Sequence, residues 1–216
     1  MSLTKFLDEI RENLLKKDEM LQEIQSLVRK TTRLAKQAIF LLHRNMTAEA
    51  ENLLNEAGTN VNKLIGMMGS YPEICIGLIE ISLQEYAEAK IFFEIIRKGT
   101  FISPRDVGVP GEFYLLGLAD VIGELRRRSL DLMRKDDVKA AEECLNLMET
   151  IYNELIRHDE LQALIPGLRR KCDIARRIIE ATRGDITMES RRVILNNTMR
   201  ELQRILESVT GYVKNK

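Results

Sequence analysis

Two pairs of carboxylates in the sequence have the spacing and surroundings of a metal site. Glu85 and Glu88 are three residues apart and Asp120 and Glu124 are four apart, so each pair would share one face of a helix. The first pair continues an apolar stripe that is predicted to face the protein interior through Leu78, Ile81, Phe92 and Ile95. Burying unpaired carboxylates is costly, so these groups need protons, cations or a metal ion there.

The chemistry of the four acids favours a hard divalent cation. Carboxylate oxygens without His or Cys prefer Mg²⁺ or Mn²⁺ to Zn²⁺, and helical bundles build metal sites from facing helices. Mg²⁺ held in this way can activate water and neutralise charge during phosphodiester cleavage. The candidate metal-binding and catalytic residues are therefore Glu85, Glu88, Asp120 and Glu124. A di-iron site would need Glu-x-x-His repeats, and His43 and His158 are not so placed.

Ordinary salt bridges are the alternative interpretation of these acids. Acidic pairs at helical spacing are common, and Lys90, Arg126, Arg127 and Arg128 are close in sequence. The metal interpretation is favoured by the apolar surroundings of both pairs. It is also favoured by the short loop 99–111, since consecutive elements joined by short connections are usually neighbours. Both interpretations stay open at this point.

The basic residues give candidates for phosphate contact. Lys plus Arg and Asp plus Glu number 33 each, so bulk charge makes no case for nucleic acid. On the first helix, Lys30, Arg33 and Arg44 can share a flank beside the apolar seam, as a phosphate-binding or merely solvated face. The later basic residues are interpreted as solvated helix faces; they are Arg169, Arg170, Lys171, Arg176, Arg177, Arg191 and Arg192.

Composition and periodicity predict an all-α fold. Hydrophobic residues make up 44 % and charged residues 31 % of the 216 residues, with few Gly and Pro and no Trp. We expect about seven long helices in an antiparallel bundle, forming a single domain over 1–216. Their approximate ranges are 3–42, 47–69, 72–96, 112–134, 138–156, 160–182 and 187–212, and the first range is either one very long helix or two nearly collinear ones. A start at Ser70-Tyr71-Pro72-Glu73, a C-cap turn at Arg183-Gly184-Asp185 and an N-cap at Thr187 define three of the ends.

The remaining sequence features predict a soluble cytoplasmic protein. Cys75, Cys144 and Cys172 are far apart and lack CxxC spacing, so we expect reduced, buried thiols. Residues 1–14 contain no signal-peptide core, and no apolar run reaches the length of a membrane span.

Three segments in order resemble the translin family. They are Phe40-Leu41-Leu42-His43-Arg44, Leu83-Gln84-Glu85-Tyr86-Ala87-Glu88-Ala89 and the run 114–125, which reads Tyr-Leu-Leu-Gly-Leu-Ala-Asp-Val-Ile-Gly-Glu-Leu. The resemblance is closer to the translin-associated factor X branch than to translin itself. The chain lacks the loop insertions and basic N-terminal extension of animal factor X proteins, and its compactness resembles a prokaryotic or archaeal member.

The resemblance implies a function as well as a fold. Family members are all-α proteins of about seven helices that assemble into octamer-like shells and bind single-stranded RNA and DNA. In the factor X branch, the matching acids form a Mg²⁺-dependent endoribonuclease site. The resemblance thus implies the same roles for Glu85, Glu88, Asp120 and Glu124. It also implies a homo-oligomer that cleaves single-stranded RNA, with single-stranded DNA as a second candidate substrate.

Two non-enzymatic functions are the alternatives. A non-catalytic RNA- and DNA-binding scaffold would bind in a salt-sensitive way that neither EDTA nor substitution of the acids changes. A helical adaptor with no nucleic-acid role would not bind short single-stranded oligonucleotides even at low salt.

Overall fold

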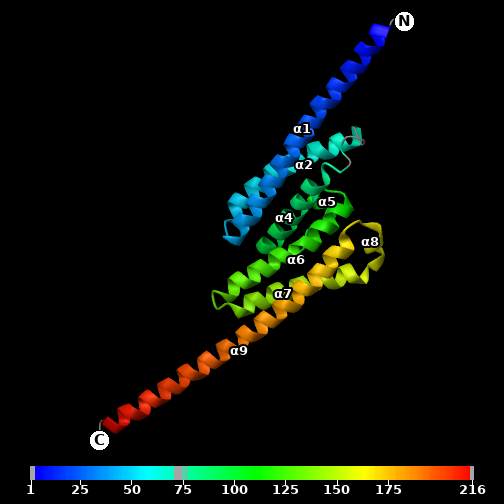
Figure 1. The fold of residues 1–216 in the computed structure, drawn as a ribbon. Helices are drawn as coiled ribbons and strands as arrows, with labels where there is room; N and C mark the ends of the chain where they lie inside the picture. The colour runs from blue at the N-terminus through cyan, green and yellow to red at the C-terminus, as the bar shows by residue number, and fades with distance from the viewer. Residues whose placement is uncertain (1–2, 71–74, 76, 215–216) are drawn as a thin grey trace. The chain divides into compact units, whose positions relative to one another are not determined.

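The computed structural model describes residues 3–70, 75 and 77–214, and these residues form helices without any strand (Figure 1). The eight helices are α1 (Leu3–His43), α2 (Thr47–Ser70), α4 (Glu80–Lys98), α5 (Pro104–Val107), α6 (Gly111–Met133), α7 (Val138–Arg157), α8 (Asp159–Leu164) and α9 (Leu168–Lys214). The predicted all-α fold is confirmed. The described part has eight helices rather than seven because α5 and α8 are short extra helices and the last two predicted helices are one.

The chain divides into two compact units. Unit 1 contains Met1–Val121 and Glu160–Lys171, and unit 2 contains Ile122–Asp159 and Cys172–Lys216. Helices α6 and α9 therefore contribute to both units. The single domain over 1–216 stays a prediction.

In unit 1, α1, α2 and α4 pack on one another. Only the later part of α1 is buried, through Ile24, Thr31, Leu34, Ala35, Ala38, Ile39 and Leu42. The three- and four-residue steps of this list are the periodicity of a helix with one buried face. The earlier part carries exposed apolar side chains, namely Leu3, Phe6, Leu7, Ile10, Leu14 and Leu15.

Helix α4 is the most buried helix of unit 1, and its buried side differs from the predicted stripe. Phe92 and Ile95 are buried as expected, whereas Ile81 is 63 % exposed, so its assignment to the interior is wrong. The reason is that α4 packs on both α1 and α2, and burial extends over several sides of the helix. The predicted start at Ser70–Glu73 includes residues 71–73, which lie outside the described residues; α4 itself begins at Glu80.

The ends of two helices in unit 1 follow glycine chemistry. Gly99 adopts a left-handed conformation with φ of 68°, and its N–H donates to the carbonyl of Ile95, which ends α4. Gly167 has φ of 86°, so Pro166-Gly167 separates α8 from α9 rather than kinking one helix.

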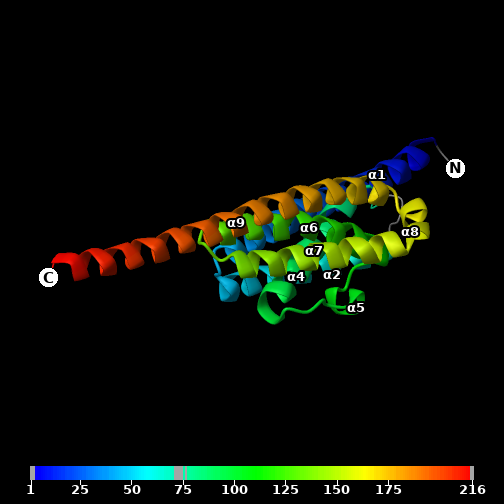
Figure 2. The ribbon, with the colours of Figure 1, turned by 90° about the horizontal axis from the view of Figure 1, so that it is seen from below.

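In unit 2, the second half of α6, α7 and α9 lie side by side (Figures 1 and 2). The Ser129 hydroxyl donates to the carbonyl of Ala141 (3.2 Å), joining α6 to α7. Arg183 pairs with Glu149 at 2.7 Å, joining α9 to α7. Helix α7 starts behind an aspartate cap, because the Asp137 carboxylate accepts the N–H of Ala140 (3.1 Å).

The predicted break in the last helix is wrong. α9 runs without interruption through Gly184, and the Thr187 hydroxyl donates to the carbonyl of Arg183 (2.7 Å) instead of capping a new helix. A single glycine costs a helix only about 1 kcal/mol, which neighbouring contacts can offset. Arg126 of α6 supplies such contacts by donating to Thr182 (2.7 Å) and Asp185 (3.1 Å).

The three cysteines lie in the protein interior. Cys75, Cys144 and Cys172 are buried and form no disulfide, as predicted. None of the described helices is both long enough and apolar enough to cross a membrane.

Candidate functional site

A glycine brings the two acid-bearing helices into close contact within unit 1. A Cβ atom on Gly117 of α6 would lie 2.7 Å from the backbone nitrogen of Glu88 and 2.9 Å from the carbonyl oxygen of Gln84, both on α4. Only a residue without a side chain allows this approach. This close approach places Asp120, one turn further along α6, beside α4.

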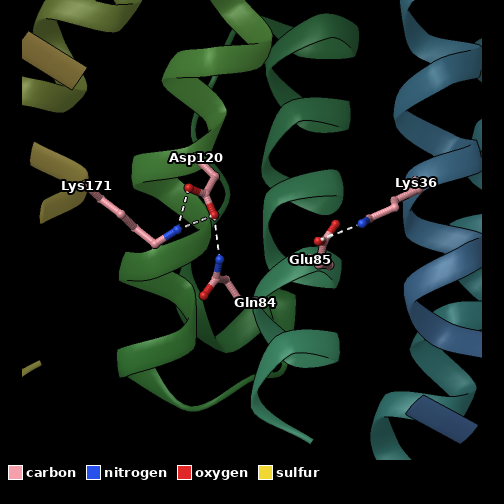
Figure 3. A network of polar contacts seen from close by, with 5 residues as sticks. All are labelled: Lys36, Gln84, Glu85, Asp120 and Lys171. Atoms are coloured by element: carbon pink, nitrogen blue, oxygen red, sulfur yellow. Dashed lines mark hydrogen bonds and ion pairs between the residues drawn. The ribbon is translucent and has the colours of Figure 1, made fainter. Parts of the chain in front are cut away.

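Asp120 lies at the centre of a polar network (Figure 3). Lys171 Nζ lies 2.6 Å from Oδ1 and 2.7 Å from Oδ2 of Asp120, and Gln84 Nε2 donates to Oδ2 at 2.6 Å. The side chains of Lys171 and Asp120 are 24 % and 26 % exposed, so solvent reaches the pair only partly. Three hydrogen bonds from two donor groups, an ammonium and an amide, thus fix the orientation of this carboxylate.

Glu85 has a different cationic partner. Its Oε1 is 3.2 Å from Nζ of Lys36 on α1, and its side chain is only 20 % exposed while that of Lys36 is 62 % exposed. In Figure 3 the Glu85 carboxylate points toward Lys36, whereas Asp120 points toward Lys171 and Gln84. The two acids therefore hold one lysine each.

The other two predicted acids lie on the same helices. Glu88 is half-buried on α4, and its backbone nitrogen forms part of the contact with Gly117. Glu124 is half-buried on α6, in the stretch that belongs to unit 2. Within the described residues, no three His, Cys, Asp or Glu side chains are grouped so that they could hold a metal ion. A divalent cation at Asp120 would therefore first have to displace the Lys171 ammonium.

Asp120 and Glu85 both form salt bridges, but with other partners than those that the salt-bridge interpretation names. Arg126 bonds to Thr182 and Asp185 in unit 2, and Lys90 lies over the ring of Phe93 at 5.6 Å. The lysines found at Asp120 and Glu85 come instead from α9 and α1.

The basic residues of α1 are placed in two settings. Lys30 pairs with Glu56 of α2 at 2.7 Å, with both side chains about half exposed. Arg33 lines an open hollow on α1, and the Arg44 guanidinium lies 5.4 Å from the centre of the exposed Phe40 ring. Lys30 thus contacts α2, while Arg33 is exposed on α1 and Arg44 is exposed in the turn that follows α1.

Residues 19–182 match the model of the translin family. Uncharacterized protein MJ0175 of Methanocaldococcus jannaschii is 33 % identical over 192 residues, covering 88 % of this chain and 85 % of that protein. The chain belongs to the translin family.

Solved structures agree with this membership. AfC3PO in complex with duplex RNA is 33 % identical, with a TM-score of 0.76, covering 85 % of this chain and 96 % of that one. The crystal structure of apo-NeC3PO is 26 % identical, with a TM-score of 0.80, covering 88 % of this chain and all of that one.

Two residues of this translin-family site have roles that the sequence did not reveal. The sequence pattern groups Lys171 with solvated basic residues. However, Lys171 directly precedes the buried Cys172, so it lies at the edge of the inward-facing stripe of α9. Gln84 directly precedes Glu85 in the motif, yet an amide gave no reason to assign it a partner 36 residues away.

A buried tyrosine of the same motif lies between α4 and α2. Tyr86 is buried, and its hydroxyl lies 2.8 Å from where a Cβ on Gly58 of α2 would be. Burial raises the pKa of the Tyr86 phenol above its usual value, so it stays neutral at physiological pH. Gly58 lowers the helix propensity of α2, but it leaves room for the side chain of Tyr86, which directly follows Glu85 on α4.

Proposed function

We propose that this chain binds RNA and cleaves it with the help of Mg²⁺ or Mn²⁺ held by acids of α4 and α6. The observation that carries the proposal is the close contact of the two acid-bearing helices at Gly117, where an added Cβ would lie 2.7 Å from the backbone nitrogen of Glu88. For a divalent ion to bind, Lys171 would have to leave Asp120, whose two oxygens it holds at 2.6 and 2.7 Å.

RNA binding is supported by family membership and by the basic face of α1. The related AfC3PO has been solved with duplex RNA. Arg33 and Arg44 are available for phosphate contact on exposed positions, with Lys30 as a weaker candidate because it pairs with Glu56. We take RNA with single-stranded regions as the preferred substrate and single-stranded DNA as the second candidate.

Self-association is part of the same proposal. The first turns of α1 expose a run of apolar side chains, and the second half of α9 exposes Ile194, Leu195, Met199, Leu202, Ile205 and Leu206. Apolar surfaces of this extent are usually covered by a partner. A homo-oligomer, octamer-like in the closed shell that the family resemblance implies, would cover them.

The donor chemistry of the proposed metal site fits Mg²⁺. Glu85, Glu88, Asp120 and Glu124 offer only carboxylate oxygens, and Mg²⁺ prefers to be held by a few of these together with waters and phosphate oxygens. When bound, the ion would lower the pKa of a water and neutralise charge on the phosphate. Gln84 would keep Asp120 oriented, and Lys171, once released, could contact a phosphate oxygen.

A non-catalytic RNA-binding protein is the second candidate, and the two ion pairs favour it. If Lys36 and Lys171 stay on Glu85 and Asp120, these carboxylates are neutralised without a metal. Such a protein would bind RNA through α1 without cleaving it.

Cleavage of a labelled single-stranded RNA separates these functions. The wild type, Asp120→Asn and Glu88→Ala are compared in Mg²⁺ and in EDTA. Glu94→Gln is the matched control, because Glu94 is a buried acid of α4 that pairs with Lys98 at 2.8 Å but is not in the proposed site. The proposal expects cleavage by the wild type and by Glu94→Gln in Mg²⁺ only. Cleavage by Asp120→Asn at the wild-type rate, or RNA binding without any cleavage, would refute the nuclease.

A further inference from the structure

The second half of α1 and the turn that follows it contain no acidic residue. Residues 24–48 contain five Lys or Arg and no Asp or Glu, in a chain where the two charges are balanced. Two of the five are partly neutralised by other helices, Lys30 by Glu56 and Lys36 by Glu85. A local positive surface in a neutral protein is the footprint expected of a phosphate-binding face.

Three of the cationic residues follow one line along the helix together with an aromatic ring. Arg29, Arg33, Lys36 and Phe40 are spaced by four, three and four residues, which places them on one face of α1, and Arg44 follows four residues later in the turn after the helix. Side chains from Val28 to Phe40 line an open hollow of about 550 Å³, within the size range of small-ligand sites. From Arg29 to Phe40 the helix rises by about 16 Å, a length over which a nucleic-acid strand presents several phosphates.

Phe40 is placed unusually for a large apolar residue. Its side chain is 50 % exposed, although its neighbours Ile39 and Leu42 are buried in the core of unit 1. The Arg44 guanidinium lies 5.4 Å from its ring centre, so a cation and a π surface are paired at the end of the basic line. Exposed aromatic rings beside Arg are the elements that stack nucleobases in proteins that bind single strands.

We propose that Phe40 and Arg44 form a base-stacking subsite at the end of a phosphate-binding line made by Arg29, Arg33 and Lys36. The inference rests on the proposed RNA binding and adds the side chains that would recognise an unpaired base of the strand. A base within a duplex is stacked on both faces by its neighbours and cannot cover the ring, so a blunt duplex would contact the cationic line alone. Lys36 also pairs with Glu85, which links this line to the acids of α4.

The test measures fluorescence anisotropy with three labelled ligands of equal length: a single-stranded RNA, a blunt RNA duplex and an abasic strand that keeps the phosphates. Phe40→Ala is compared with the wild type and with Phe101→Ala, whose phenylalanine is 43 % exposed but lies in the loop before α5. We expect Phe40→Ala to bind the single strand about 5- to 150-fold more weakly. Its affinity for the duplex and the abasic strand should equal that of the wild type, and Phe101→Ala should match the wild type throughout.

Three outcomes would overturn the subsite. One is unchanged single-strand affinity in Phe40→Ala. Another is an equal loss for the single strand and the abasic strand, which would mean that the ring only supports the phosphate contacts. The third is a change in the assembled mass of Phe40→Ala by light scattering, which would assign this face to contact between copies of the chain. A wild type that binds none of the ligands would refute RNA binding itself, whereas the first two outcomes leave it intact.

Discussion

Substitution of Gly117 by Ala tests the close contact of α4 and α6 on which the site depends. The added Cβ would lie 2.7 Å from the Glu88 nitrogen, 2.8 Å from the Ala87 Cβ and 2.9 Å from the Gln84 carbonyl oxygen. Two of these atoms are backbone and cannot rotate away, so the helices must separate by several tenths of an ångström. Overpacking of this kind costs about 1–3 kcal/mol, from which the better helix propensity of Ala subtracts up to about 1 kcal/mol.

The expected net loss is therefore about 1–2 kcal/mol of unfolding free energy, or roughly 2–8 °C in melting temperature for a chain of this size. Urea unfolding followed by circular dichroism at 222 nm measures the loss. Gly123→Ala is the matched control on the same helix, because no described atom outside its local surroundings lies within 4 Å of its added Cβ. The unfolding free energy of Gly123→Ala should equal that of the wild type or exceed it by up to about 1 kcal/mol. Equal stability of the two variants would refute the reasoning.

Three further predictions concern single side chains. Lys171→Met should bind Mn²⁺ about five- to tenfold more tightly than the wild type in a calorimetric titration, because Asp120 no longer holds an ammonium; unchanged or weaker binding would contradict this. Burial raises the pKa of the Cys144 thiol to about 11, so alkylation by iodoacetamide at pH 9 should be at least about 50-fold slower than in the unfolded chain. The folded state disfavours that thiolate, so its stabilising effect should be full below pH 9 and decline as the pH rises through 11, a decline that Cys144→Ala removes. Asp137→Ala should lower the unfolding free energy by about 1 kcal/mol, whereas Asp137→Ser should retain most of the cap; equal losses in the two would speak against capping.

Much of the helix arrangement follows from local sequence signals. Apolar periodicity without Gly or Pro predicts the long first helix, and α1 runs from Leu3 to His43. Asp137 and the loop glycines mark ends that depend on residues close in sequence, so they are readable without a structure. Gly184 has the same local signal, yet α9 continues through it because Arg126 bonds to the residues on either side. Such tertiary contacts leave no trace in local propensity.

The candidate site was predictable only in part. The short loop 99–111 predicts that α4 and α6 meet, which the contact between Gly117 and Glu88 confirms. The cationic partners could not be predicted, because Lys171 is 51 residues from Asp120 in sequence and many basic residues compete for the same acid. The predicted burial of Ile81 is wrong, because α4 packs on two helices and no single stripe of residues marks its buried side. Whether the four acids hold one metal centre stays a prediction.

Electron paramagnetic resonance of Mn²⁺ titrated into the protein tests the central claim most directly, because it reports the bound ion without requiring cleavage. The account predicts saturable binding by the wild type, loss of that binding in Asp120→Asn and Glu85→Gln, and full binding by Glu94→Gln. No saturable binding by the wild type, or binding that persists in Asp120→Asn, would contradict it.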